Sequence, residues 1–232
     1  MKENTSHNFA AILPAGGLGK RLGADTPKQL LTLGEKAMYK HSLDLFWNEP
    51  RIAQVVLAVP KEWQDFFIKD LRNYDANRLT IVEGGAERWQ SVRHGIEALE
   101  SHIEYALVHD VARPFLSAEI LQAVLKKVQK EACIVAKPCV DTVKIVRKQN
   151  IVETIDRNLV WLAQTPQAAR VDLLKKLYVR MDGDALDWNP TDEASILEHY
   201  GVAVGIVPGN TLNDKITTAE DLELFRKRLS YE

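Results

Sequence analysis

Short apolar runs alternate with amphipathic helical patterns along most of the chain. The runs lie at residues 9–13, 55–59, 79–82 and 105–108. They are almost continuously hydrophobic, as is typical of parallel strands that helices cover on both faces. Between them, residues 89–99 carry apolar side chains at helical spacing, which indicates an amphipathic helix. The alternation predicts an α/β fold: a three-layer, Rossmann-like arrangement around a mostly parallel sheet.

The pattern changes after residue 135. Residues 141–146 and 151–155 alternate polar and apolar side chains, and residues 147–150 join them. This predicts a β-hairpin, which we expect to project as an arm at about residues 138–160 and to pack on a partner chain. The α/β pattern then resumes, with a strand predicted at 202–207 and a helix at 218–229. Because no linker or repeat interrupts the pattern, residues 1–232 are expected to form a single domain.

The predicted sheet also predicts where a ligand binds. In open α/β sheets, ligands bind beyond the carboxyl ends of the strands. The loops that follow Leu13, Val82 and Val108 should therefore meet at one site.

The first of these loops is rich in glycine and basic residues. Glycines directly after a strand allow the backbone to approach a phosphate, and arginine or lysine beside them adds fixed positive charge. A dinucleotide fingerprint is excluded because it needs glycine at Leu22, and a Walker loop is excluded because it needs Ser or Thr at Arg21. A solvated basic turn is the alternative. The candidate residues are Pro14, Ala15, Gly16, Gly17, Gly19, Arg21 and Lys28.

The other two loops carry different chemistry. Asp110, just after a buried strand, is suited to Mg²⁺, which prefers oxygen ligands, and Arg113 is close enough in sequence to contact a phosphate beside it. The alternative is a turn aspartate with a structural arginine. His109 is expected to be structural. In the loop after Val82, backbone N–H groups at a helix start can bind a base edge or a phosphate; a simple strand-to-helix turn is the alternative. The residues concerned there are Gly84, Gly85, Arg88 and Ser91.

Two further positions lie late in the chain. Thr191 begins a helical pattern and is either a ligand-binding residue or an N-cap, with Ala194 at the position where a capping box needs Glu or Gln. Lys215 lies between the last strand and the last helix, where it either closes over a phosphate or is solvated.

Composition narrows the class of protein. The chain has 30 basic and 32 acidic residues and a formal net charge of -2, so nothing in it attracts nucleic acid or an anionic membrane as a whole. No apolar run has the length of a membrane span, and the polar N-terminus lacks a signal-peptide core. Cys133 and Cys139 show no paired ligand motif, so reduced thiols and a cytoplasmic protein are expected.

Taken in order, these motifs give a family resemblance. Over nearly the whole chain the sequence resembles the methylerythritol phosphate cytidylyltransferases of non-mevalonate isoprenoid synthesis, and it is also similar to the ribitol phosphate cytidylyltransferases. The motifs that carry the resemblance are Pro14-Ala15-Gly16-Gly17 to Arg21, Pro27-Lys28-Gln29, Gly84-Gly85 to Arg88, His109-Asp110 to Arg113-Pro114, Asp141-Thr142, Asp156-Arg157-Asn158, Thr165-Pro166-Gln167, Thr191-Asp192-Glu193-Ala194 and Lys215-Ile216-Thr217. Gly16, Ala86 and Asp214 depart from the residues that many relatives carry.

The resemblance implies a Mg²⁺-dependent homodimer that joins CMP from CTP to a polyol phosphate. It assigns catalysis to Arg21, Lys28 and Lys215. It assigns nucleotide binding to Pro14, Ala15, Gly16, Gly17, Gly19, Gly84, Gly85, Arg88 and Ser91. It assigns the polyol phosphate to Asp110, Arg113, Thr142, Arg157 and Thr191, with Asp110 also the metal ligand. Thr142 and Arg157 would reach the partner's site from the arm.

Several alternatives stay open at this point. The nearest is the same reaction on ribitol phosphate for wall-polymer synthesis, and a wider one is nucleotidyl transfer to a hexose phosphate from another nucleotide. A third is a protein that binds the nucleotide without turnover, although a binder has no need of Arg21, Lys28, Asp110 and Lys215 together. A dinucleotide-dependent oxidoreductase is disfavoured by the failed glycine fingerprint.

Overall fold

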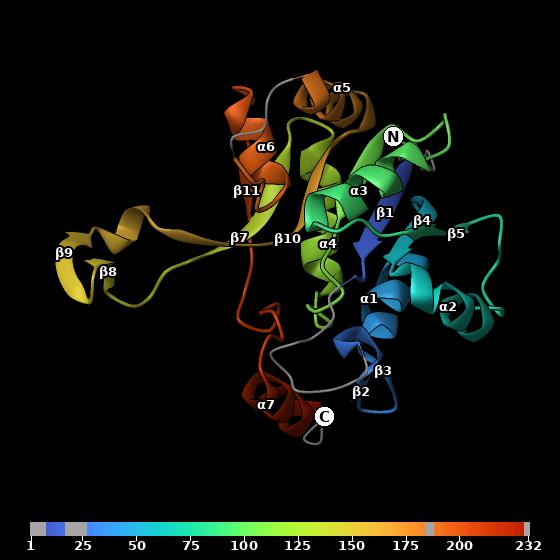
Figure 1. The fold of residues 1–232 in the computed structure, drawn as a ribbon, viewed down its shortest axis with the longest axis horizontal. Helices are drawn as coiled ribbons and strands as arrows, with labels where there is room; N and C mark the ends of the chain where they lie inside the picture. Colours follow the sequence, from blue (N-terminus) through green and yellow to red (C-terminus); the bar gives the residue numbers. More distant parts are fainter. Residues whose placement is uncertain (1–7, 17–26, 184–187, 230–232) are drawn as a thin grey trace, which may run out of the picture.

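A seven-stranded sheet forms the centre of the fold in the computed structural model, which describes residues 8–16, 27–183 and 188–229 (Figure 1). Its strands are β1 (Phe9–Pro14), β4 (Ile52–Val59), β5 (Leu79–Glu83), β6 (Tyr105–Val108), β7 (Cys133–Pro138), β10 (Trp161–Arg170) and β11 (Gly205–Pro208). They lie in the order β11-β7-β10-β6-β1-β4-β5. Only β10 among them runs antiparallel to its neighbours, β6 and β7, so the mostly parallel sheet predicted from the sequence is confirmed.

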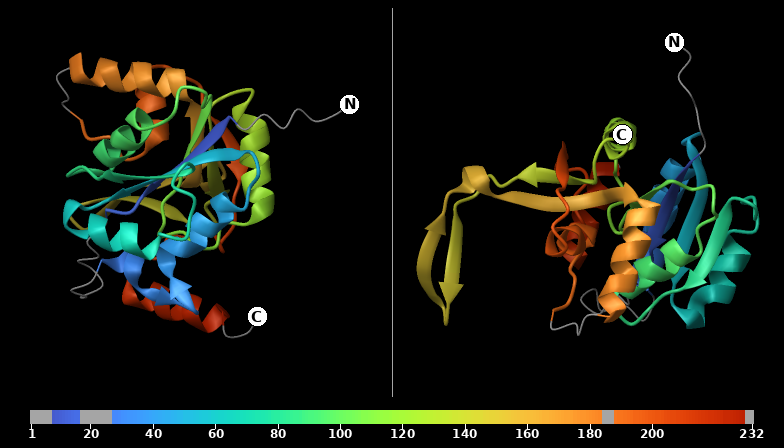
Figure 2. Two further views of the ribbon diagram at one scale, coloured as in Figure 1. Left: turned by 90° about the vertical axis from the view of Figure 1, so that its right-hand side faces the viewer. Right: turned by 90° about the horizontal axis from the view of Figure 1, so that it is seen from above.

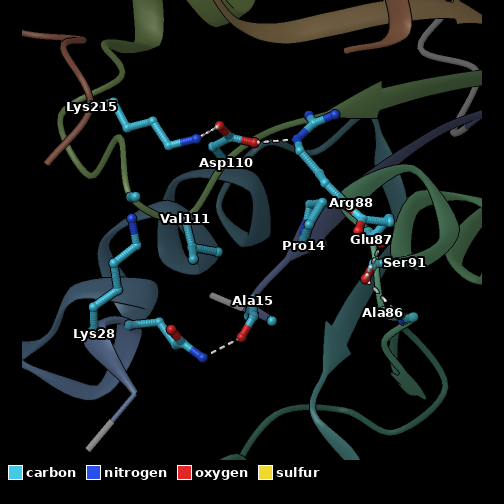
Figure 3. A pocket seen from close by; sticks show the side chains of 14 residues that line it. Pro14, Ala15, Lys28, Ala86, Glu87, Arg88, Ser91, Asp110, Val111 and Lys215 are labelled. Atoms are coloured by element: carbon cyan, nitrogen blue, oxygen red, sulfur yellow. Dashed lines mark hydrogen bonds and ion pairs between the residues drawn. The ribbon is translucent and has the colours of Figure 1, made fainter. Parts of the chain in front are cut away.

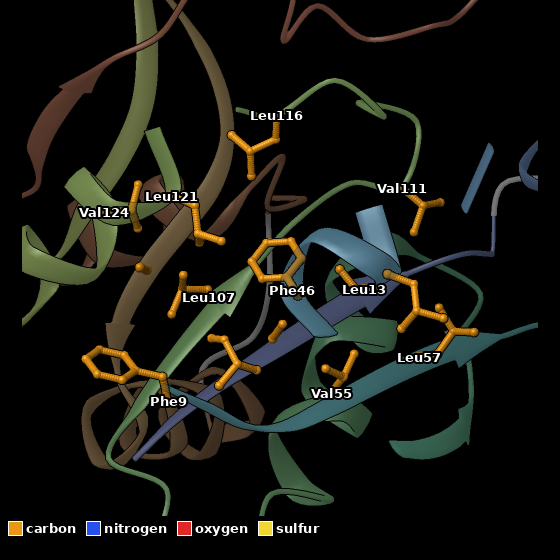
Figure 4. Packing of buried hydrophobic residues seen from close by; sticks show 14 of the residues in the cluster. Phe9, Leu13, Phe46, Val55, Leu57, Leu107, Val111, Leu116, Leu121 and Val124 are labelled. Atoms are coloured by element: carbon orange, nitrogen blue, oxygen red, sulfur yellow. The ribbon is translucent and has the colours of Figure 1, made fainter. Parts of the chain in front are cut away.

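Helices cover both faces of the sheet and make the fold three-layered (Figures 1 and 2). On one face lie α1 (Met38–Trp47), α2 (Gln64–Asp70) and α4 (Ala118–Val128). On the other lie α3 (Arg88–Glu97), α5 (Val171–Gly183) and α6 (Glu193–His199). Alternate residues of β1 serve the two faces: Leu13 packs with the first set of helices (Figure 4) and Ile12 with the second. This explains why the strand is apolar throughout.

A third, smaller cluster holds the end of the chain against the site. Helix α7 (Ala219–Leu229) packs on the short hairpin of β2 (Thr32–Leu33) and β3 (Lys36–Ala37). Ile216 is fully buried in this cluster, and its backbone N–H donates to the Ala112 carbonyl at 2.8 Å. These contacts bring Lys215, the next residue toward the N-terminus, over the loop that follows β6.

The predicted hairpin projects from the body of the molecule (Figures 1 and 2). It consists of β8 (Val143–Arg147) and β9 (Asn150–Ile155), which pair antiparallel, followed by a 3₁₀ turn at Arg157–Leu159. The connecting turn is only Lys148 and Gln149, both with positive φ, so it is shorter than the predicted 147–150. Several apolar side chains of the arm are exposed, among them Ile151 at 64% and Leu159 at 81%.

One predicted strand is wrong in extent. The strand expected at 202–207 begins only at Gly205. Gly201 takes a positive φ just after α6, and the Val202 N–H donates to the Leu197 carbonyl at 2.8 Å. This is the usual way of closing a helix, so Val202 ends α6 instead of pairing in the sheet. The described part of the chain contains no helix that is long and apolar enough to cross a membrane.

Candidate active site

The loops after β1, β5 and β6 meet in one cavity of about 270 Å³ at the carboxyl edge of the sheet, as predicted (Figure 3). The 3₁₀ turn Lys28–Leu30 and the segment before α7 complete its wall. The residues that line it are Pro14, Ala15, Gly16, Lys28, Gln29, Gly85, Ala86, Glu87, Arg88, Ser91, Asp110, Val111, Ala112 and Lys215.

The loop after β1 is fixed by backbone contacts. The Ala15 N–H donates to the Ala58 carbonyl at 2.7 Å, and the buried amide of Gln29 donates to the Ala15 carbonyl. Among the described residues, a Cβ on Gly16 would meet only the Ser91 hydroxyl, at 3.9 Å, so within that part of the chain this departure from the family pattern leaves room for alanine. Gly17, Gly19 and Arg21 lie outside the described residues.

The loop after β5 depends on the close approach of its backbone to α3. The Gly85 N–H donates to Ser91 Oγ at 3.0 Å, and Glu87 and Gln90 form a reciprocal capping box at the helix start. A Cβ on Gly85 would lie 2.2 Å from the Gln90 Cβ, so only glycine fits. Ser91 supports the loop through this bond while also lining the cavity. Gly84 does not line it; its N–H donates to the Val59 carbonyl at 2.7 Å.

Asp110 is the electrostatic centre of the cavity. Arg88 Nε donates to its Oδ1 at 3.0 Å and Lys215 Nζ to its Oδ2 at 2.6 Å (Figure 3). Burial alone would raise the pKa of Asp110, but the charges of Arg88 and Lys215 outweigh it and hold that pKa well below its usual range. Asp110 is therefore an anion at neutral pH, with two cations facing the same cavity.

A second, smaller cavity of about 160 Å³ adjoins the first and shares Arg88, Asp110 and Lys215 with it. Arg113 and Thr191, both predicted to bind the polyol phosphate, line this second cavity. The Arg113 guanidinium is oriented by the carbonyls of Asn213 and Ala163, at 2.9 and 3.3 Å. Two ligands could thus meet beside Asp110.

Thr191 is not the N-cap of α6. Asp192 caps that helix by accepting from the Ser195 N–H at 2.9 Å, and Ser195 completes the capping box that Ala194 could not. Gln167 of β10 fixes the same turn, because its amide donates to Asp192 Oδ2 and accepts from the Ala194 N–H, both at 2.9 Å. Thr191 is thereby left to line the cavity.

His109 is structural, as expected. Its side chain is fully buried, with Nε2 3.1 Å from the Arg113 carbonyl and Nδ1 3.0 Å from Thr165 Oγ1. A carbonyl can only accept, so Nε2 carries the proton. Burial lowers the pKa of His109 to about 4. The same Thr165 hydroxyl accepts from the Asp110 N–H at 3.1 Å and so orients the aspartate.

Asp214 does not disturb the neighbouring lysine. Lys137 Nζ lies 2.6 Å from Asp214 Oδ2, and the Gln164 amide donates to Oδ1 at 2.9 Å. The negative charge of Asp214, which departs from the family pattern, is therefore balanced by Lys137 and not by Lys215.

The residues to which the sequence assigned no role are Gln29, Gln167 and Glu193. Their signal was a polar side chain inside a motif, but only the fold shows what each one contacts.

The arm residues do not join either cavity of the same chain. Thr142 and Arg157 are exposed, and the Arg157 guanidinium donates to the Val140 carbonyl at 2.8 Å. Within the described residues there is also no cluster of three or more His, Cys, Asp or Glu that could hold a metal. Mg²⁺ is often held by only one or two carboxylates together with substrate phosphates, and a single carboxylate such as Asp110 is enough for that kind of site.

Comparison with known proteins places this site in a family. The family model for "IspD: 2-C-methyl-D-erythritol 4-phosphate cytidylyltransferase" matches residues 9–229. Relatives with that enzyme name include one from Clostridioides difficile, 34% identical over 97% of this chain and 94% of its own, and one from Haemophilus influenzae, 39% identical over 94% and 95%. The crystal structure of 4-diphosphocytidyl-2C-methyl-D-erythritol synthase from Anaerococcus prevotii superposes with a TM-score of 0.84 at 28% identity, covering 98% of this chain and 100% of that one. The chain belongs to the family of 2-C-methyl-D-erythritol 4-phosphate cytidylyltransferases.

Proposed function

We propose that this protein transfers CMP from CTP to 2-C-methyl-D-erythritol 4-phosphate in isoprenoid synthesis and releases pyrophosphate. The observation that carries the proposal is the pair of adjoining cavities that share Arg88, Asp110 and Lys215. The larger one takes the nucleotide, and the smaller one, with Arg113 and Thr191, takes the polyol phosphate. The α-phosphate of CTP then lies between them, where the acceptor oxygen can reach it.

Cations do the main catalytic work. Lys28 and Lys215 line the same side of the nucleotide cavity, across from Arg88 and Ser91 (Figure 3), and Lys28 Nζ donates to the Ile216 carbonyl at 3.3 Å. Both lysines stabilise the charge that builds on the transferring phosphoryl group, with Arg21 as the third member of the set. Preorganised charges of this kind act only weakly in the ground state and strongly in the transition state. Removing one costs about 3 to 4 kcal/mol. The loops around Gly16 and Gly85 hold the nucleotide.

The reaction needs no general base. The second pKa of a phosphate monoester is about 6, so the attacking oxygen of the polyol phosphate is already largely deprotonated at neutral pH. The obstacle is repulsion between two polyanions, which Arg113 and the nucleotide-side cations reduce while they align the reactants. The neutral His109 is consistent with this scheme because it is fully buried, lines neither cavity, and has both ring nitrogens bonded within the protein, to the Arg113 carbonyl and the Thr165 hydroxyl.

Asp110 is the residue that would hold Mg²⁺ beside the triphosphate. The bound ion supplies additional positive charge for the phosphate oxygens. Lys215 and Arg88 already contact Asp110, so the carboxylate is oriented before any ligand arrives.

The arm completes the functional unit. Its exposed apolar side chains fit a contact with a second copy, and its Thr142 and Arg157 are exposed and line neither cavity of their own chain. The enzyme is thus a homodimer in which each arm completes the partner's acceptor cavity. Residues 1–232 act as one nucleotidyltransferase domain in the cytoplasm, where the free thiols of Cys133 and Cys139 stay reduced.

Pyrophosphate release from CTP and Mg²⁺ tests the proposal, with methylerythritol phosphate and ribitol phosphate offered separately. We expect fast release with the first acceptor only. Lys28→Ala should lower kcat about 100- to 1,000-fold, whereas Lys126→Ala, an exposed lysine of α4, should leave kcat unchanged. Preference for ribitol phosphate would move the protein to wall-polymer synthesis. Tight CTP binding without release would make it a nucleotide-binding protein.

A further inference from the structure

Glu193 is a buried charge that the chemistry described above does not use. It is the first residue of α6 and exposes only 2% of its surface. Nη1 and Nη2 of Arg88 donate to its two carboxylate oxygens at 2.9 and 3.0 Å. This is the bidentate, charge-assisted geometry of an ionised carboxylate. Removing a charge from water is costly, so a role beyond filling space is expected.

The pairing fixes the direction of Arg88. A guanidinium is planar and rigid, so anchoring Nη1 and Nη2 on one carboxylate also determines where Nε points. Here Nε points at Asp110 Oδ1, 3.0 Å away (Figure 3), and both residues line the two cavities. Without Glu193, the guanidinium of Arg88 could rotate so that two of its nitrogens face Asp110. That rotation would change the position of the Asp110 carboxylate.

Glu193 also belongs to the acceptor side of the site. Thr191 lies two residues before it, and Gln167 holds Asp192 and Ala194 on either side of it. The Arg88–Glu193 ion pair therefore joins the start of α3 to the start of α6. Helix α3 begins beside the nucleotide cavity and α6 begins beside the acceptor cavity, so the ion pair connects the two sides of the site.

We infer that Glu193 is a positioning residue for CMP transfer, which holds Arg88 in place against Asp110 and ties the Thr191 segment to the nucleotide cavity. The inference rests on the proposed function, because it concerns the geometry of that reaction. Glu49 supplies the matched control: it is 7% exposed and its Oε1 accepts from Arg51 Nε at 2.7 Å. Glu49 precedes the amino end of β4, whereas the cavities lie at the carboxyl ends of the strands.

The test is a double-mutant cycle on kcat with Glu193→Gln, Arg88→Gln and the double variant, beside Glu49→Gln. Glutamine keeps the shape of the side chain and removes the charge. We expect E193Q to lower kcat about 100-fold, as small misplacements of reacting groups do, and E49Q to stay within about threefold of wild type. If Glu193 acts through Arg88, the double variant should fall no more than about threefold below R88Q.

Glu193→Asp keeps the charge but shortens the side chain, and it replaces E193Q if that variant does not fold. We expect E193D to lose about 10-fold or more in kcat while unfolding cooperatively. A wild-type kcat in either folded variant, or losses that multiply in the cycle, would overturn the inference while wild-type turnover upholds the proposed function. Absence of turnover in the wild type would overturn both together.

Discussion

At the scale of single residues, the site is a set of charges that balance one another before any ligand binds. Asp110 holds Lys215 and Arg88 by one oxygen each. When a triphosphate enters, Lys215 can turn toward it from the position it already occupies, while Arg88, anchored on Glu193, keeps Asp110 in place, so little reorganisation is needed. Charged residues of this kind were predictable because a lysine, arginine or aspartate carries its charge wherever the fold places it. Gln29 and Gln167 were not, because an amide reveals its role only through its contacts.

The buried thiol of Cys133 gives a residue-scale prediction about pH. Burial raises the pKa of Cys133 to about 12, above the ordinary value of 9.0. The unfolded chain therefore loses this proton first as pH rises, so the stabilisation is complete below pH 9 and is lost between 9 and 12. Unfolding free energy should fall there by about 1.4 kcal/mol per pH unit from this group.

Urea unfolding at pH 9 and 10 measures this effect, with Cys133→Ala as the control that keeps every other titrating group. The difference in unfolding free energy between wild type and variant should shrink from pH 9 to pH 10. Thiol labelling of the native protein at pH 8 should modify the half-buried Cys139 and spare Cys133. An unchanged difference, or equal labelling of both thiols, would contradict the burial seen here.

At the scale of elements, the close packing of α3 on β1 sets the position of the nucleotide loop. A Cβ on Gly95 of α3 would lie 2.5 Å from Ile12 Cγ2 of β1. Gly95→Ala should therefore destabilise the protein by about 1 to 3 kcal/mol, although alanine favours a helix. Chemical denaturation measures this change.

The companion variant is Ile12→Ala, which removes the clashing methyl group. Alone it should cost about 2 to 5 kcal/mol because it leaves a cavity. Together with Gly95→Ala, part of the space is refilled, so the double variant should lose less than the sum of the single losses. Strict additivity would show that the methyl group added at position 95 does not enter the space that Ile12 leaves.

The strands predicted from the sequence are those that are almost continuously apolar. β1, β4, β5 and β6 were predictable from their apolar runs. β10 was not, because Gln164, Thr165 and Gln167 interrupt it. These polar residues are buried in the sheet and bond to Asn213, His109 and Asp192. The strand departs from an apolar pattern where it supports the site, which is where local rules are expected to fail.

At the scale of the whole molecule, the proposed dimer can be tested by mixing two inactive proteins. Lys28→Ala disables the nucleotide cavity, and Arg157→Ala disables the arm. In a mixed dimer, the intact arm of the first protein meets the intact cavity of the second. Equal amounts that exchange subunits should therefore recover about a quarter of wild-type turnover, since half of the dimers carry one good site of two. Recovery near zero would show that the arm acts within its own chain.

The projecting arm has a consequence for how the enzyme behaves at different abundances. If a site is complete only when two chains meet, the fraction of working sites follows mass action. Specific activity would then decline as the protein is diluted below the dissociation constant of the dimer, although each chain stays folded. In a cell that makes little of this protein, activity would fall by a larger factor than the protein concentration. The apolar surface of one hairpin thus links the expression level to the catalytic output.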